Sequence, residues 1–251
     1  MAINYRTDEE IDKIRAANQI VSAALDRLEE IVRPGVTTAE LDREAEKIIK
    51  KMGGRPSFKG YRGFPNALCV AVNEGVVHGI PGSYALKEGD IIGLDLGAEK
   101  DGYYGDSART LPVGAVSPEA GKIIKVTRDA LMKGISQIRP GGHVSDISNA
   151  VQTHAESQGF SVVTSFVGHG IGSQPHEDPQ VPNFGRPGRG PALRKGMVLA
   201  IEPMINAGTA EVVILRDGWT VKTSDGALSA HFEHSVAVTA EGYEILSISQ
   251  K

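Results

Sequence analysis

The 251-residue chain has a single cysteine, no signal-like N-terminus and no long apolar run. Because Cys69 stands alone, an internal disulfide is excluded, which is compatible with a reducing compartment. The first residues, MAINYRTDEE, contain no apolar signal core. No stretch approaches the roughly 20 apolar residues that a membrane-spanning helix needs. We therefore expect a cytoplasmic protein that does not act at a membrane.

The chain also lacks a strong excess of charge of either sign. Its net charge is -4, with 23% charged and 40% hydrophobic residues, a composition that is ordinary for a globular protein with a real core. Such a balance gives no reason to expect nucleic acid as a specific partner. There is no low-complexity tract and no charged tail. We expect one domain that spans residues 1–251.

Several familiar catalytic and metal motifs are missing as well. The sequence contains no GxSxG nucleophile elbow, no HExxH and no phosphate-binding GxxxxGK[ST]. No serine, cysteine or threonine stands out as a nucleophile. The shortage of cysteine also argues against a structural zinc site. Any chemistry should therefore come from carboxylates and histidines.

A hairpin with two carboxylates, in residues 88–110, is the most informative stretch that is present. An apolar run ends on Asp95, and after an Asp-Gly turn signal the chain returns to Asp106. Both lie equally far from a turn centred between Lys100 and Asp101, so a regular hairpin would place their Cβ atoms roughly 4.5–5.5 Å apart. Two carboxylates that close require a shared proton, a lysine or arginine, or metal ions roughly 3.5–4 Å apart between them.

Helices and further strands are predicted from caps and periodicity. Residues 7–10 and 37–40 are capping boxes, each followed by apolar residues at helical spacing. The first helix should stop near residues 33–35 and the second at residues 53–54. A third helix should begin at Ser117-Pro118. Residues 67–77 (ALCVAVNEGVV) are predicted to form one strand.

The two halves of the chain resemble each other. The triplet RPG at residues 33–35 recurs at residues 139–141, an offset of 106, and Gly53 recurs as Gly159. With an offset of 107, residues 88–95 resemble residues 195–202, and each segment ends an apolar strand on a carboxylate. A duplication explains these matches better than coincidence. It would place Asp95 and Glu202 at related points of one cavity.

The candidate site combines four carboxylates at predicted strand ends with one histidine in a glycine-rich loop: Asp95, Asp106, His169, Glu202 and Glu233. Hard oxygen donors with one imidazole suit a pair of divalent cations. Taken singly, each residue could equally be solvated or form a turn. Together they predict a metal centre, where two cations would activate a bound hydroxide as the nucleophile.

Six segments together resemble methionine aminopeptidase of type I over essentially the whole chain. They are GYRGFPNALCVAVNEGVVHGIP, GDIIGLDLGAEKDGYYGDSART, VGHGIG, PHEDP, GMVLAIEPM and DGWTVKTSDGALSAHFEHSVAVT. The resemblance implies the pita-bread (creatinase/aminopeptidase) fold, an α/β fold with pseudo-two-fold helix-helix-strand halves around a central antiparallel sheet. It implies removal of the initiator methionine from nascent polypeptides that have a small second residue.

The resemblance also implies individual roles at the matching positions. Asp95 would chelate one metal ion, Asp106 and Glu233 would bridge two, and His169 and Glu202 would bind the second. The ions could be Co²⁺, Mn²⁺, Fe²⁺ or Zn²⁺. His78 and His176 would contact the scissile amide, and Glu202 would carry the proton during hydroxide attack on the carbonyl.

The side-chain pocket for methionine is implied to be apolar and deep. Its lining positions match Tyr61, Phe64, Cys69 and Trp219. Plain core packing is the alternative for these residues, above all for Cys69. Pro175 and Phe58 depart from residues common in the family, which leaves the fine specificity of the pocket open.

Three alternatives use the same fold: a prolidase or aminopeptidase P relative, a creatinase-like hydrolase without metal, and a non-catalytic peptide-binding module. The length of 251 residues argues against the first, and the intact ligand set argues against the other two. The family is commonly monomeric, so we expect a monomer. The arginines of the loop at residues 185–194 could touch ribosomal RNA, although a solvated loop is the simpler interpretation.

Overall fold

Four α-helices are present in residues 2–249, and the three that were predicted from caps begin where expected. The computed structural model describes residues 2–249. Within that range the α-helices are α1 (Asp8–Ile31), α2 (Thr38–Lys51), α3 (Pro118–Ile135) and α4 (Val144–Ser157). Both predicted capping boxes are present: the Thr7 hydroxyl accepts from the Glu10 N–H, and the Glu10 carboxylate accepts from the Thr7 N–H at 2.9 Å. No helix of residues 2–249 is long and apolar enough to cross a membrane.

A large antiparallel sheet forms the centre of the molecule. Its strands are β1 (Arg55–Pro56), β2 (Leu68–Val72), β4 (Ile91–Lys100), β5 (Tyr103–Pro112), β7 (Gly168–Gly170), β8 (Glu177–Val181), β9 (Val198–Ile201), β14 (Glu233–Val238) and β15 (Tyr243–Ile245). They follow the order β1-β4-β5-β14-β9-β7-β8, with β2 paired to β4 and β15 to β14. Strands from the two halves of the chain therefore meet at the β5–β14 pair.

Two small three-stranded sheets and one short 3₁₀ helix lie beside the large sheet. One sheet joins β13 (Ser229–His231), β10 (Met204–Asn206) and β6 (Ser161–Val162), and the other joins β11 (Val212–Ile214), β12 (Val221–Thr223) and β3 (Gly75–Val77). The short helix η1 spans Tyr61–Gly63. The prediction of one strand at residues 67–77 was wrong: a turn at Asn73 (φ 53°) separates β2 from β3, which pair with different partners.

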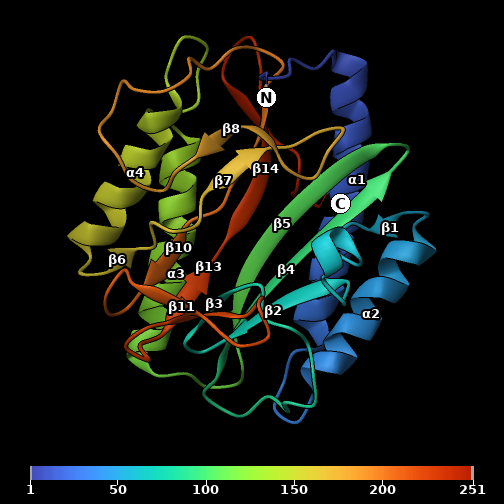
Figure 1. Cartoon of the computed structure of the whole chain (residues 1–251), viewed down its shortest axis with the longest axis vertical. Coiled ribbons are helices and arrows are strands. Elements are labelled where there is room, and N and C mark those ends of the chain that lie inside the picture. Colours follow the sequence, from blue (N-terminus) through green and yellow to red (C-terminus); the bar gives the residue numbers. More distant parts are fainter. Residues whose placement is uncertain (1, 250–251) are drawn as a thin grey trace.

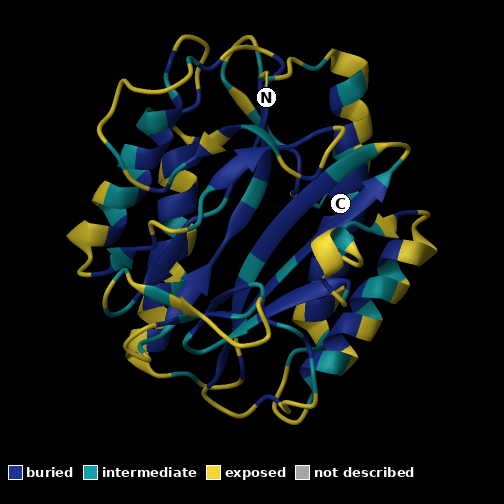
Figure 2. Ribbon diagram, viewed as in Figure 1, coloured by how far each residue is buried: buried dark blue, intermediate teal, exposed yellow. Residues whose placement is uncertain are grey.

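The helices cover the sheet in two pairs. Figure 1 shows α1 and α2 beside the long β4–β5 hairpin and α3 and α4 toward the other end of the sheet. The central strands are buried along most of their length, and the outward helix faces are exposed (Figure 2). Helix α1 lies directly on β5, because a Cβ atom at Gly105 would be only 2.6 Å from the Asn18 backbone nitrogen. The apolar face of α1 packs there with Leu94 and Leu96.

The duplication is visible in the backbone. An isolated bridge joins Thr37 to Ala85 in the first half, and one joins His143 to Ala192 in the second. Gly35 and Gly141, at the same turn of each half, have left-handed φ values of 90° and 84°. The predicted pseudo-two-fold α/β fold is therefore confirmed, with a helix pair in each half. The expectation of four strand-end carboxylates was wrong for Asp95 and Asp106, which lie within β4 and β5, whereas Glu202 directly follows β9 and Glu233 begins β14.

The register of the carboxylate hairpin differs from the prediction. The turn residues are Asp101 and Gly102, with φ of 53° and 81° as a type I′ turn requires. Asp106 therefore faces Gly97, and Asp95 faces Ala108. The Asp-Gly signal was interpreted correctly, but the centre of the turn was placed one residue too early. Because side chains alternate along a strand, Asp95 and Asp106 still lie on one face, as diagonal neighbours.

Candidate metal centre

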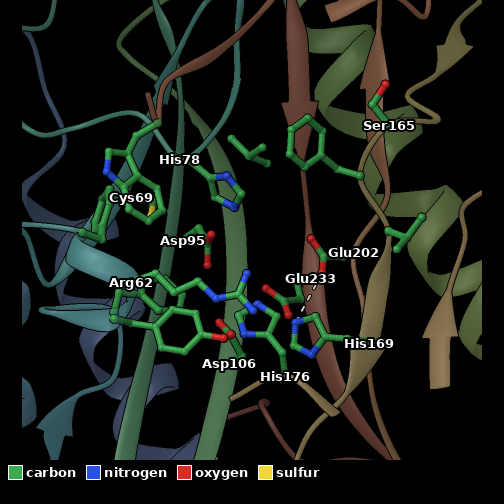
Figure 3. Close-up of a pocket in the computed structure, with 17 residues that line it drawn as sticks. Arg62, Cys69, His78, Asp95, Asp106, Ser165, His169, His176, Glu202 and Glu233 are labelled. Atoms are coloured by element: carbon green, nitrogen blue, oxygen red, sulfur yellow. Dashed lines mark ion pairs between the residues drawn. The ribbon is translucent and has the colours of Figure 1, made fainter. Parts of the chain in front are cut away.

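The five predicted metal ligands come from five strands that are consecutive in the sheet. In the order β4-β5-β14-β9-β7, Asp95 lies in β4, Asp106 in β5 and His169 in β7, Glu233 begins β14, and Glu202 directly follows β9. All five line one cavity of about 340 Å³. Figure 3 shows their side chains pointing into it. Residues more than a hundred positions apart in the sequence thus converge because their strands are neighbours.

The donor atoms of this cluster fit a metal centre. One ligand atom from each of Asp106, His169 and Glu233 lies within 4.8 Å of the others. Oxygen atoms of three buried carboxylates have no hydrogen-bond partner: Asp95 Oδ1, Asp106 Oδ1 and Glu233 Oε1. Buried polar atoms are nearly always paired, so unpaired carboxylate oxygens in one cavity fit a site for a cation. The oxygen-rich donor set with one imidazole suits divalent metals.

The electrostatics of the cavity agree with this interpretation. Burial and the charges of Asp106 and Glu202 raise the pKa of Asp95 well above its usual value. Burial likewise raises the pKa of Asp106 and of Glu233, and charged neighbours raise each further. Each of these carboxylates is therefore costly to ionise unless a positive charge enters the cavity.

Glu202 differs from the other acids. Burial alone would raise its pKa, but His231, His169 and His78 more than offset burial, and the pKa is lowered. Glu202 Oε1 lies 3.5 Å from His169 Nε2, and Oε2 lies 3.6 Å from His231 Nε2. Glu202 therefore stays a carboxylate near neutral pH.

The ring of His169 is oriented by its neighbour. Its Nδ1 lies 2.9 Å from the Gly170 carbonyl oxygen, which can only accept a hydrogen bond, so Nδ1 carries the proton. This leaves Nε2, the atom that faces Glu202, with its lone pair free. A backbone carbonyl on the far nitrogen is the usual partner of a metal-binding histidine.

The two predicted substrate histidines also lie on the cavity wall. The ring of His176 is 4.2 Å from that of His169 and stacks on Tyr61 at 5.3 Å and 14°. His78 meets the Phe166 ring edge-on at 5.6 Å. Burial is the main cause that lowers the pKa of both histidines, so each is a neutral imidazole near neutral pH.

The four predicted pocket residues line the same cavity: Tyr61, Phe64, Cys69 and Trp219. Phe64 packs edge-on against Trp219 at 5.2 Å. Phe58 lines the cavity too, whereas Pro175 is not one of its lining residues. The departure at Phe58 therefore bears on the pocket wall, and the departure at Pro175 does not bear on it directly.

Two residues of the site were missed from the sequence: His231, which lies against Glu202, and Arg62, which lines the cavity. His231 is 3% exposed and its Nε2, which faces Glu202, has no hydrogen-bond partner. It stands two positions before Glu233, and a period of two could have suggested a common face. Arg62, the other one, lines the cavity from η1. No pattern in the sequence distinguishes Arg62 from a solvated arginine.

The backbone at His78 depends on Gly79. His78 has a left-handed φ of 59°, and a Cβ atom at Gly79 would lie 2.0 Å from the Val70 carbonyl oxygen. We expect Gly79→Ala to break the hydrogen bond from Val70 N–H to the Gly79 carbonyl, now 2.9 Å, and to displace His78. Turnover should fall about 10-fold or more, and the free energy of unfolding should fall by about 2–3 kcal/mol, in assays and urea titrations.

Gly82→Ala is the matched control, because no atom lies within 4 Å of a Cβ there. It lies in the same connection to β4 and should change neither turnover nor stability measurably. Equal effects of the two substitutions would contradict the role of close backbone packing at Gly79.

Comparisons with known proteins agree with the geometry. Residues 12–240 match the family described as Metallopeptidase family M24. A methionine aminopeptidase of Clostridium perfringens is 54% identical over 246 residues, which cover 98% of this chain and 99% of the relative. Methionine aminopeptidase 1 of Bacillus subtilis is 52% identical and covers 96% of this chain and 98% of the relative.

Solved structures give the same result. A methionine aminopeptidase from Thermotoga maritima superposes with a TM-score of 0.98 at 45% identity and covers 99% of this chain and all of that chain. A prolidase from Pyrococcus furiosus has a TM-score of 0.77 at 21% identity, and the match covers 98% of this chain but only 66% of that chain. The second likeness shows the shared fold alone.

Proposed function

The chain belongs to metallopeptidase family M24, and from that premise we propose that it removes the N-terminal methionine from nascent polypeptides whose second residue is small. It is a metal-dependent methionyl aminopeptidase, a hydrolase, like its full-length relatives. The observation that carries the finer proposal is the convergence of four carboxylates and His169 in one cavity beside an aromatic wall.

The ligand set supports two divalent ions rather than one. Asp95 and Asp106 lie at one end of the cluster and His169 and Glu202 at the other, with Glu233 between their strands in the sheet order. When bound, such ions supply Lewis-acid chemistry, which activates a water molecule and polarises the scissile carbonyl. Mn²⁺, Fe²⁺, Co²⁺ and Zn²⁺ all accept this set of oxygen and nitrogen donors.

The side chains around the cluster supply the remaining steps. Glu202 is ionised and can accept the proton of the attacking water at a carboxylate oxygen, then pass it to the leaving amine nitrogen. His78 and His176, as neutral imidazoles, each have one N–H to donate to the substrate amide or to the oxyanion. The buried carboxylates of Asp106 and Glu233 are held in position by the paired strands β5 and β14.

The wall formed by Phe64, Cys69 and Trp219 suits an unbranched apolar side chain. Methionine fits such a wall through its flexible thioether and sulfur–aromatic contacts. The first residue of the substrate would thus place its side chain on this wall and its amino group near the carboxylates.

A panel of short peptides tests the proposal. Met-Ala-Ser should be cleaved, and Ala-Ala-Ser should be cleaved about 10–100-fold less efficiently, since burying a methionine side chain contributes about 1.5–3 kcal/mol. Met-Leu-Ser should be a poor substrate because of its large second residue. The measurement is kcat/KM by detection of the released amino acid.

The same panel separates the alternatives. Cleavage of Ala-Pro-Ser in preference to Met-Ala-Ser would indicate a prolidase or aminopeptidase P activity. Binding of Met-Ala-Ser without cleavage, in the presence of each of the four metals, would indicate a peptide-binding module. Either result would overturn the proposed specificity while leaving the family assignment intact.

We also propose the cellular setting. The substrates would be polypeptides emerging from the ribosome, which places the enzyme in the cytoplasm as a monomer without a specific nucleic-acid partner. The lone Cys69 and the modest negative charge support this setting. Arg189, in the loop that could approach the ribosome, is anchored by its backbone N–H to the Ser145 hydroxyl of α4 at 2.6 Å.

A further inference from the structure

Arg62 is the only lysine or arginine that lines the cavity within residues 2–249. Asp106 and Glu233, at the floor of the cavity, are 4% and 3% exposed, whereas Arg62 is an exposed residue. Arg62 therefore marks the solvent side, at the mouth. In Figure 3 its side chain extends toward His176, whose imidazole feels the charge of Arg62.

The backbone and an aromatic stack hold Arg62 there. Its φ is 49°, in the left-handed region that arginine rarely adopts, and it lies in a turn closed by the hydrogen bond from Gly60 N–H to the Phe64 carbonyl at 2.8 Å. The guanidinium carbon lies 5.3 Å from the centre of the Tyr61 ring, which in turn stacks on His176. The side chain is thus directed over the cavity.

The positive charge of Arg62 has no carboxylate partner among residues 2–249. Within residues 2–249 its guanidinium forms no ion pair and no hydrogen bond, unlike Arg6, Arg15 and Arg109, whose side chains are all paired with carboxylates. A guanidinium has five N–H donors in a planar fork that matches a carboxylate. An unpaired fork at the mouth of a peptide-binding cavity is available for an anionic group of the substrate.

We propose that Arg62 forms a subsite for an acidic side chain at the third or fourth residue of the substrate. The inference rests on the proposed function, in which the substrate enters amino-terminus first. Its first residue then occupies the buried end, and the residues after the scissile bond pass the mouth. An aspartate or glutamate there would pair with Arg62, whereas a lysine or arginine would be repelled. Arg62 thus selects among methionine-initiated chains by downstream charge.

Peptides of equal length test the subsite. Met-Ala-Xaa-Gly-amide and Met-Ala-Gly-Xaa-amide, with Xaa as Glu, Gln or Lys, report the two positions, and the C-terminal amide removes the terminal carboxylate as a competing anion. For the metal-loaded enzyme at low ionic strength, kcat/KM should favour Glu over Lys by about 5-fold or more at one of the positions. The ratio should shrink when ionic strength rises from about 0.02 M to about 0.5 M.

Variants assign the effect to the residue. In Arg62→Gln the Glu-to-Lys ratio should fall below about 2-fold, and Arg62→Lys should retain a preference for Glu. Arg128→Gln is the matched control, because Arg128 is an exposed arginine of α3 that does not line the cavity, and its ratio should equal that of the unaltered enzyme. Circular dichroism and metal analysis accompany each variant.

Two results would overturn the proposal: a ratio near one at both positions in the unaltered enzyme, or a preference for Glu that persists in Arg62→Gln or at high salt. If Arg62→Gln does not fold, the dependence of the Glu-to-Lys ratio on ionic strength and the ratio measured for Arg62→Lys still test the proposal. Failure of the proposed function looks different, because then the Gln peptides, which carry no charge at Xaa, would not be cleaved either.

Discussion

Asp106→Asn is expected to abolish catalysis and yet to stabilise the metal-free protein. The substitution removes a ligand from the centre of the cluster, so kcat/KM should fall by about 10³-fold, which corresponds to about 4 kcal/mol of transition-state stabilisation. Metal content, measured by elemental analysis, should fall with it. Without metal, the same substitution removes one of several buried carboxylates that repel one another, so the melting temperature should rise.

Asp90→Asn is the control, since Asp90 is also a buried aspartate but its oxygens are satisfied. Asn73 donates to its Oδ1 at 2.8 Å, and the Tyr84 hydroxyl and Lys87 N–H donate to its Oδ2 at 2.9 Å. Replacing Asp90 should lower the melting temperature and leave metal content intact. Should Asp106→Asn instead destabilise the metal-free protein, burial and the charge of Glu202 would be the wrong explanation for its raised pKa.

Removal of metal by a chelator is expected to stop Met-Ala-Ser cleavage, and binding of metal should release protons. Burial and mutual charge raise the pKa values of Asp95, Asp106 and Glu233, so the metal-free cluster holds protons that the cation must displace. Metal affinity should therefore rise as pH rises and be lost as pH falls. Calorimetry with Mn²⁺ in buffers of different ionisation enthalpy measures the protons released.

The measurement should be repeated at several values between about pH 5.5 and 8. The number of protons released should fall as pH rises through the raised pKa values of the carboxylates. At 100 times the dissociation constant, metal should stabilise the fold by about 2.7 kcal/mol, or about 5–10 °C in melting temperature. A metal affinity that does not change between pH 5.5 and 8 would contradict the raised pKa values.

The raised pKa values also predict how the metal-free protein responds to pH. A carboxyl group whose pKa is higher in the folded than in the unfolded state favours folding below its ordinary pKa, and this contribution is lost as pH rises through the folded value. At neutral pH these buried carboxyl groups therefore lower the free energy of unfolding of the metal-free protein. Packing in the rest of the molecule must offset this cost. Such a cost at a functional site is offset when the cation enters.

Local features were predictable from the sequence because local interactions decide them. The capping boxes at Thr7 and Thr37, the Asp-Gly turn and the duplicated Arg-Pro-Gly turns all depend on neighbouring residues, and the structure has each of them. The ligand types were also readable, since a carboxylate ends the matching apolar segment of each half, Asp95 in the first and Glu202 in the second. The family resemblance added the order of the motifs.

The wrong predictions concern features that depend on contacts between distant parts of the chain. Asn73 breaks the predicted strand at residues 67–77, because β2 and β3 pair with different sheets, and no local signal states which partner a strand will take. The predicted centre of the hairpin turn was one residue too early. The partner of Asp106 is therefore Gly97 and not Asp95. The period of two kept both carboxylates on one face, so the error did not change the site.

The sequence by itself determined where the three capped helices begin, the paired halves and the chemical character of the ligands, because these depend on spacing and on residue type. Only the tertiary structure decided that β4, β5, β14, β9 and β7 are consecutive neighbours, and so brought five distant side chains into one cavity. It also placed His231 against Glu202 and Arg62 on the wall of that cavity. Strand order and side-chain direction follow from packing across the whole chain, which no single segment encodes.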